Sequence, residues 1–246
     1  MTRRKDRFQE GPRSRAFRQS FFPEATDEQW NDWRWQLRNS IRDLYGLSRI
    51  FELSENERTA IQRNLGGLPV GITPYYASLL DRREANQGLR RTMMMVNQEY
   101  IRTPEESIDP LSEDADSPVP GIVHRYPDRV LFLVTGTCAV YCRYCTRSRM
   151  VGPPTGEYEF NTKQWERAIE YIAENRNVRD VLLSGGDPLI LSDERLEWLL
   201  SKLRRIPHVE FLRIGTKIPA VLPQVQRDCE DPRIIRFDSK TGWQQR

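Results

Sequence analysis

Three cysteines lie within eight residues of one another, at Cys138, Cys142 and Cys145, with the spacing C-x3-C-x2-C. An odd number of closely spaced cysteines without a preceding secretion signal favours metal binding over a disulfide framework. Structural zinc needs four ligands, whereas a four-iron cluster is held together by three thiolates and keeps one iron open. The spacing therefore predicts a [4Fe-4S] cluster with a reactive iron. A zinc site is the alternative, and its candidate fourth ligands are Cys229, His124 and His208.

Three short apolar runs predict the strands that would position this loop. Residues 130–134 form a continuous apolar run, typical of a strand buried on both faces, and residues 181–183 give a second buried strand. Residues 209–214 supply a third strand. Helices capped by Asn161 and Ser192 are expected between them. This order of elements predicts right-handed crossovers and a parallel sheet. Because chemistry in such sheets lies after the carboxyl ends of strands, the cysteine loop is the expected site.

The region before the sheet is predicted to be helical. Thr26 and Gln29 form a capping box, and apolar residues at helical spacing then predict one helix that ends at Gly46. Further helix starts are indicated at Ser54 with Glu57 and at Thr73 with Pro74. The tryptophans here are expected to be packing residues: Trp30, Trp33 and Trp35. Residues 105–120 are acidic and proline-bearing without periodicity, which predicts a loop that links two domains.

The charge of the chain limits the classes of partner. The 246 residues carry a formal net charge of +3, and residues 1–20 alone hold seven Lys or Arg against Asp6 and Glu10, a balance of +5. Acidic residues interrupt this run and no aromatic ladder follows it, so we expect a solvated, disordered tail rather than a nucleic-acid arm or transit peptide. The longest apolar run has five residues, whereas a membrane span needs about 20. We expect a cytoplasmic protein without a membrane or nucleic-acid partner.

The cysteine motif after a first buried strand, with Tyr144 just before the last cysteine, resembles the radical S-adenosylmethionine (SAM) superfamily. The second strand ends in Ser184-Gly185-Gly186-Asp187, which is similar to the superfamily motif that contacts the amino group of SAM. The resemblance implies that Tyr144 and these four residues bind SAM. It also implies that the open iron chelates SAM and that the reduced cluster cleaves it to a 5′-deoxyadenosyl radical.

Longer stretches resemble the lysine 2,3-aminomutase family, and the likeness covers residues 21–224. The stretches that carry it are residues 30–37, 72–79, 124–130, 145–149, 180–187, 206–210 and 221–224. The family resemblance implies an isomerase that moves the α-amino group of an amino acid, here lysine, to the β-carbon. It further implies pyridoxal 5′-phosphate (PLP) as a cofactor, a small-molecule amino acid as substrate, and an electron donor such as flavodoxin or ferredoxin.

Three further positions follow from the motifs of that family. Arg147 matches the arginine that holds the substrate carboxylate, a task suited to the planar guanidinium fork. Arg125 and Tyr126 match residues that contact the PLP phosphate. The glycine-rich motif that carries the family's PLP lysine is absent from this sequence, and Lys217 is the only lysine at a site-facing level. No catalytic residue is assigned, and the residues that select the substrate cannot be identified.

The predicted fold is α/β: an incomplete parallel (β/α) radical SAM barrel at residues 125–224, preceded by a helical region and linker at residues 21–124. A complete barrel takes about 250 residues, so the 117 residues from Val130 to Arg246 supply about half of one. Residues 225–246 form an atypical tail. Three functions therefore remain open: an aminomutase-family enzyme, a cluster- and SAM-binding relative without aminomutase activity, and a zinc-stabilised interaction module. A homo-oligomer or a complementing fragment would cover the exposed edge of the third strand, which otherwise predicts poor solubility.

Overall fold

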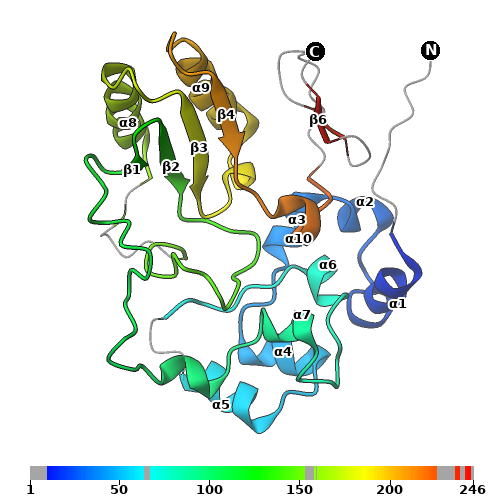
Figure 1. The fold of residues 1–246 in the computed structure, drawn as a ribbon. Coiled ribbons are helices and arrows are strands. Elements are labelled where there is room, and N and C mark those ends of the chain that lie inside the picture. Colours follow the sequence, from blue (N-terminus) through cyan, green and yellow to red (C-terminus); the bar gives the residue numbers. More distant parts are fainter. Residues whose placement is uncertain are drawn as a thin grey trace, which may run out of the picture.

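The computed structural model describes residues 10–63, 67–152, 158, 160–225, 236–238 and 242–244. The first part of the chain folds into short helices that form the lower half of the view in Figure 1. Their bounds are α1 (Pro12–Phe21), α2 (Asp27–Trp30), α3 (Trp33–Arg38), α4 (Leu44–Ile50), α5 (Glu55–Arg63), α6 (Pro74–Ala77), α7 (Gly88–Arg91) and the 3-10 turn η1 (Asn97–Tyr100).

The capping box of Thr26 and Gln29 is present, but the single helix predicted to run from it to Gly46 is wrong. Two aspartates begin new helices and so divide this region into separate ones. Asp32 caps α3 by accepting from the backbone N–H of Arg34, and the side chain of Asp43 accepts from the N–H of Gly46 at 2.7 Å. Such side chains compete with the backbone for hydrogen bonds, so they favour caps over helix interiors. Gly46 consequently lies inside α4.

The prediction of a disordered tail over residues 1–20 is wrong from Pro12 onward, where α1 begins. Proline suits this position, since the first turn of a helix needs no N–H from it. Phe17 of α1 is buried against the helical core, and Arg18 donates to Asp27 at 2.6 Å. Residues 1–9 lie outside the described part of the chain.

The second part of the chain is a four-stranded sheet in the order β1-β2-β3-β4, with two long helices. Its elements are β1 (Ile122–Tyr126), β2 (Arg129–Thr135), α8 (Thr162–Glu174), β3 (Asp180–Gly185), η2 (Pro188–Ile190), α9 (Asp193–Arg204), β4 (Phe211–Ile214) and α10 (Ile218–Val221). Asn161 and Ser192 cap α8 and α9 as predicted. A separate two-stranded antiparallel sheet, β5 (Arg236–Asp238) with β6 (Gly242–Gln244), lies in the tail.

Strands β2, β3 and β4 are parallel, as the sequence predicts, but the sheet as a whole is mixed. The added strand, β1, pairs antiparallel with β2. Tyr126 pairs with Arg129 across a two-residue turn, and a connection that short can only join antiparallel neighbours. The third predicted strand starts at Phe211 rather than at Val209, which instead packs in the core.

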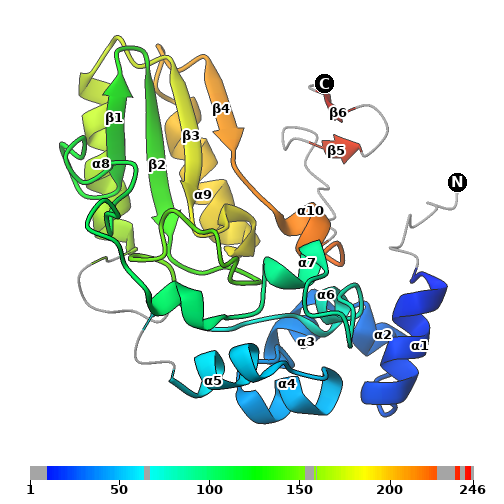
Figure 2. The same ribbon diagram turned by 60° about the horizontal axis from the view of Figure 1, so that its bottom comes forward.

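Helices α8 and α9 cover one face of the sheet (Figure 2). Alternate residues of β2 and β3 point into the core against them, including Phe132 and Leu183, both of which are fully buried. The opposite face carries the other residues of the strands, and there Leu131 and Leu182 are only partly buried and Arg213 is exposed. No helix in the described residues is long and apolar enough to cross a membrane.

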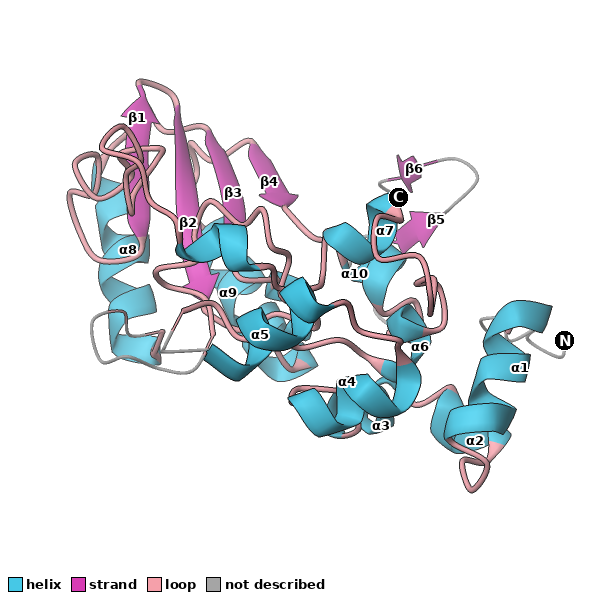
Figure 3. Cartoon of the chain, turned by 90° about the horizontal axis from the view of Figure 1, so that it is seen from below, coloured by secondary structure: helices cyan, strands magenta, loops and turns pink. Residues whose placement is uncertain are grey.

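The helical part and the sheet are joined by a shared core and by hydrogen bonds. Ala139 and Val140, which follow β2, and Ile218 of α10 belong to the same apolar cluster as the helices. Figure 3 shows α10 beside α6 and α7 of the helical part. Thr73 at the start of α6 donates its hydroxyl to the backbone carbonyl of Val221 at 3.2 Å. The three tryptophans pack in this cluster, Trp30 as a fully buried side chain.

A buried ion pair holds the helical part together. The Arg90 side chain is 0% exposed and donates to both oxygens of Glu57, at 2.9 and 2.7 Å. It also donates to the backbone carbonyls of Asp81 and Glu52, while Glu57 accepts from the backbone N–H of Ser54. Removing one member would leave the other charge buried without its partner.

We expect Arg90→Ala to lower the free energy of unfolding by about 3–5 kcal/mol, because Glu57 would stay buried and unpaired. The control is Arg83→Ala, which breaks an ion pair with Glu52 whose side chains are 82% and 66% exposed. That variant should cost about 0–1 kcal/mol. Urea unfolding followed by circular dichroism measures both, and equal losses would contradict the role given to the buried pair.

Candidate functional site

The three cysteines lie on one loop, the cluster loop, which we define as residues 136–150. All three are free and partly buried. The loop begins directly after the carboxyl end of β2, where the sequence analysis places the site. Cys138 and Cys145 pack against a small apolar cluster that includes Leu133 and Met150. The predicted ligands therefore share a sheltered position at one end of the sheet.

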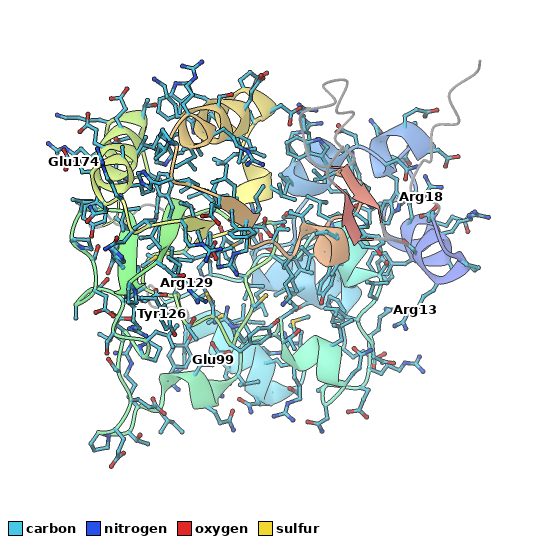
Figure 4. The ribbon with its side chains drawn as sticks, turned by 45° about the horizontal axis from the view of Figure 1, so that its top comes forward. Arg13, Arg18, Glu99, Tyr126, Arg129 and Glu174 are labelled. Atoms are coloured by element: carbon cyan, nitrogen blue, oxygen red, sulfur yellow. The ribbon has the colours of Figure 1, made fainter. Side chains whose placement is uncertain are left out.

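Arg143 anchors the cluster loop to the helical part. Its backbone N–H donates to the carbonyl of Thr92 at 2.8 Å, and its guanidinium donates to the carbonyls of Leu68 and Pro69 at 3.1 and 2.9 Å. It also forms an ion pair with Glu99, which Figure 4 labels. Because backbone and side chain are both tied down, the loop between the second and third cysteines has a fixed path.

A close approach between the ring of Tyr141 and the backbone of Gly71 fixes the first half of the cluster loop. The N–H of Tyr141 donates to the carbonyl of Gly71 at 3.1 Å. A Cβ at Gly71 would lie 2.7 Å from the Tyr141 ring, which is closer than real Cβ contacts come. Only glycine allows this packing, so the helical part is shaped to receive the cluster loop.

The Gly-Gly pair after β3 lets two loops meet backbone to backbone. Gly185 has a φ of +112°, which side-chain-bearing residues rarely adopt, and its Cβ would lie 2.4 Å from the carbonyl oxygen of Thr135. A Cβ at Gly186 would lie 2.4 Å from the carbonyl oxygen of Thr137. The predicted SAM motif thus packs directly against the start of the cluster loop.

Asp187 connects three loops at this end of the sheet. Its N–H donates to the carbonyl of Thr137 at 2.9 Å. Its carboxylate accepts from the hydroxyl of Thr216 and from the N–H groups of Leu189 and Lys217, at 2.6, 3.1 and 2.7 Å. The side chain is buried and its oxygens face these donors, so Asp187 orders the loops after β2, β3 and β4 around the cysteines.

Lys217 directs its ammonium group at the cluster loop. The Nζ lies 3.1 Å from the Sγ of Cys142, contacts the hydroxyl of Tyr144 and sits 4.5 Å from the centroid of that ring. Tyr144 itself is 59% exposed. The structure therefore brings together Lys217, Tyr144 and the middle cysteine, whereas the sequence placed Lys217 only at the level of the site.

Arg147 lies on the cluster loop between the acidic loop and the end of β3. Its Nε and Nη2 donate to the carboxylate of Glu113 at 2.9 and 2.6 Å, and its Nη1 is 3.4 Å from the hydroxyl of Ser184. Glu113 is buried. The residue that the family resemblance assigns to a substrate carboxylate thus already holds one carboxylate of the chain itself.

Arg125 and Tyr126 lie on β1, away from the cysteines. They line a cavity of ≈ 190 Å³ together with Arg129, Arg213 and the apolar side chains of the uncovered sheet face. Arg125 forms an ion pair with Asp116 at 2.6 Å, and Tyr126 is 55% exposed next to Arg129 (Figure 4). Among the described residues, no lysine lines this cavity.

The chemistry of the three thiols suits an iron–sulfur cluster, because a cluster binds each thiolate to a different iron. Within the described residues, no group of three or more His, Cys, Asp or Glu side chains is placed to hold a single metal ion. The two histidines considered as fourth zinc ligands face α8, where His124 contacts the hydroxyl of Tyr171 and His208 the carbonyl of Ile172. Cys229 lies outside the described residues.

Burial favours the protonated form of two of the thiols, Cys138 and Cys145. It raises the pKa of Cys138 to about 12, with smaller contributions from Asp187 and from the other two cysteines, and it also raises the pKa of Cys145. Metal ligands must be thiolates, so binding a cluster releases these protons and neutralises the charge that burial disfavours.

Sequence reasoning missed the residues that support the site. Glu113 and Arg149 are charged residues in irregular segments, and Glu99 lies in the short 3-10 turn η1, so no periodicity marks them. Arg149 pairs with the acidic loop through Asp109 and Asp114 at 3.2 and 3.0 Å. The available signal was the run of acidic residues at 105–116 together with three arginines in the cluster loop, since opposite charges of that density pair when they are brought close.

Comparison with known proteins agrees with the motifs. The profile of the Radical SAM superfamily matches residues 132–230. The L-lysine 2,3-aminomutase of Fusobacterium nucleatum is 48% identical over 207 residues, which is 84% of this chain and 48% of that protein. The enzyme of the same name from Acetoanaerobium sticklandii is 47% identical over 85% of this chain and 50% of its own length. This chain belongs to the lysine 2,3-aminomutase family of radical SAM proteins.

The relatives of this chain are named for more than one amino acid. A glutamate 2,3-aminomutase of Clostridioides difficile is 39% identical over 81% of this chain and 47% of its own length. The chain spans about half the length of the curated relatives it matches.

We expect Gly186→Ala to displace the start of the cluster loop, because its Cβ would lie 2.4 Å from the carbonyl oxygen of Thr137. The free energy of unfolding should fall by about 1–3 kcal/mol, and most of the iron bound after anaerobic reconstitution should be lost. Gly88→Ala is the control, since nothing lies within 4 Å of a Cβ at that position. Iron and sulfide analysis of both variants measures the effect, and a fully loaded Gly186→Ala protein would contradict it.

Proposed function

We propose that this chain binds a [4Fe-4S] cluster through Cys138, Cys142 and Cys145, binds SAM on the open iron, and uses them to initiate 2,3-migration of the amino group of L-lysine. The observation that carries the proposal is the single loop of three sheltered thiols at the carboxyl ends of β2 and β3. When bound, the cluster and SAM together supply the one-electron chemistry that generates a hydrogen-abstracting radical.

The chain's own residues position these groups and exclude water. The backbone contacts of Gly185 and Gly186 close the gap between the SAM motif and the cluster loop, because even a Cβ would not fit there. Asp187 holds the loops together through protein hydrogen bonds, so its proposed part in SAM binding is to shape the pocket. Ser184, Tyr144 and the two glycines are left as the proposed contacts for SAM.

Arg147 is the proposed receptor for the substrate carboxylate. It lies two residues after the last cysteine, so it holds the amino acid beside the cluster. A guanidinium binds a carboxylate through two parallel N–H bonds, which fixes both the distance and the orientation of the substrate. This placement allows a reactive group formed at the cluster to meet the β-carbon.

The described residues fit PLP only in part. Arg125 and Tyr126 supply candidate contacts for a phosphate in the cavity on the uncovered sheet face. Arg125 is occupied by Asp116, and Lys217 contacts Cys142 and Tyr144 rather than this cavity. The names of the relatives are the remaining support for PLP in this chain.

We further propose that β2, β3 and β4 are the first strands of a (β/α) barrel. Their inner face is uncovered, and β4 pairs within the described residues only with β3. A complementing fragment or a second copy of the chain could pair with the edge of β4. The electron would come from a small donor of the flavodoxin or ferredoxin type.

We expect Cys142→Ala to lose the cluster. After anaerobic reconstitution the wild-type protein should be brown, with broad thiolate-to-iron absorption near about 400 nm, and the variant should be colourless with little bound iron. Cys229→Ala serves as the control and should keep its colour. A colourless wild-type protein that holds one zinc ion, lost in Cys229→Ala, would establish the interaction module instead.

We expect the reconstituted chain to form 5′-deoxyadenosine from SAM and reductant, and Arg147→Lys to weaken the lysine-dependent part of the reaction. Lysine keeps the charge but lacks the planar fork, so the KM for L-lysine should rise about tenfold, or 1.4 kcal/mol. Chromatography of 5′-deoxyadenosine and β-lysine measures the two steps separately. Cleavage of SAM without β-lysine would contradict the aminomutase activity and leave a cluster- and SAM-binding relative.

A further inference from the structure

The acidic loop is bound to the site by several ion pairs. We call residues 109–116 the acidic strap. Its carboxylates pair with three arginines of β1 and the cluster loop: Asp109 and Asp114 with Arg149, Glu113 with Arg147, and Asp116 with Arg125. A segment predicted as an interdomain linker is therefore part of the wall of the site.

Glu113 is the most buried carboxylate of the acidic strap. Its side chain is 5% exposed, compared with 16% for Asp109, 34% for Asp116 and 53% for Asp114. A carboxylate at that depth is costly unless hydrogen bonds and a positive charge surround it. The preceding residue, Ser112, has a φ of +51°, an uncommon conformation for a residue other than glycine. The strap bends at that point to place Glu113 on Arg147.

The way Glu113 binds leaves one edge of the guanidinium available. A guanidinium has five N–H donors, and both its Nε/Nη2 edge and its Nη1/Nη2 edge match a carboxylate. Glu113 takes the Nε/Nη2 edge, with its oxygens 2.6 to 3.1 Å from these nitrogens. Among the described residues, Nη1 has only the hydroxyl of Ser184, at 3.4 Å. The remaining edge faces the carboxyl end of β3.

Arg149 offers no such edge. Its side chain is 6% exposed and is paired with Asp109 and Asp114, and an oxygen of Glu113 lies 3.7 Å from its Nη2. The hydroxyl of Tyr158 also lies 3.2 Å from its Nε. Of these two arginines, Arg147 can therefore bind a second carboxylate, whereas Arg149 holds the acidic strap in place.

We propose that Glu113 is a positioning residue that clamps Arg147, so that the Nη1/Nη2 edge of its guanidinium faces the carboxylate of an amino acid substrate beside Ser184. The inference rests on the proposed function of Arg147. It adds a role for the acidic strap: the strap pre-orders the receptor, so that binding the substrate does not have to immobilise a flexible arginine.

The test compares Glu113→Gln, which keeps the shape and removes the charge, with Glu106→Gln, the same change at an exposed position just before the strap. Isothermal titration of the cluster-loaded protein with L-lysine should show affinity weakened about ten- to a hundredfold in Glu113→Gln. Glu106→Gln should match the wild type, and Glu113→Asp, which keeps the charge at shorter reach, should lie between them. Melting temperatures identify any loss that comes from unfolding alone.

A second measurement does not depend on lysine binding. Labelling with phenylglyoxal, followed by peptide mass spectrometry, reports how freely Arg147 reacts. Arg147 should be modified faster in Glu113→Gln than in the wild type or in Glu106→Gln. Unchanged labelling would overturn the clamp. Tighter L-lysine binding in Glu113→Gln would also overturn it, since Glu113 would then compete with the substrate.

The proposed function and this inference fail in different ways. If Arg147→Ala binds L-lysine as well as the wild type does, or the wild type does not bind it, the substrate role of Arg147 is wrong. The labelling result still decides whether Glu113 restrains the guanidinium. If Arg147→Ala loses L-lysine binding while Glu113→Gln retains it, the role of Glu113 is wrong and that of Arg147 stands.

Discussion

The site depends on one backbone contact, made where the loop after β3 crosses the start of the cluster loop. Gly186 and Asp187 donate their N–H groups to the carbonyls of Thr135 and Thr137, at 2.5 and 2.9 Å. The two loops can come this close only because Gly185 and Gly186 have no side chains. This contact fixes the position of the cluster loop, and so of its three cysteines, relative to the carboxyl ends of the strands. The other contacts of the site hold further segments to the same loop.

Charged side chains connect this contact to the loop after β4 and to the helical part. Asp187 binds the N–H of Lys217 and so ties the loop after β4 to the same point. Arg143 binds Glu99 and two backbone carbonyls, which ties the helical part to the cluster loop. The helical part is thus a support for the site rather than a separate module. This arrangement explains why its apolar cluster includes Ala139 and Val140.

Local patterns predicted the elements well where a single segment determines its own conformation. The runs of apolar residues at β2 and β3 and the caps at Asn161 and Ser192 needed no partner to be recognised. The failures involve competing local signals or distant partners. Asp32 and Asp43 divided one predicted helix, and β1 was not predicted because its burial comes from pairing with β2. Helix α1 was not predicted, because the charged residues dominate its sequence and the buried Phe17 makes no apolar pattern by itself.

The sequence by itself determined the chemistry: three thiols at fixed spacing, a Gly-Gly motif after a buried strand, and an arginine two residues beyond the last cysteine. These are short-range features, set by neighbouring residues in one loop. Only the tertiary structure decided what surrounds them. The pairing of Glu113 with Arg147 joins residues 34 positions apart, and that of Lys217 with Cys142 joins residues 75 apart. Charges at such separations carry no periodic signal, because their partners are chosen by the path of the folded backbone.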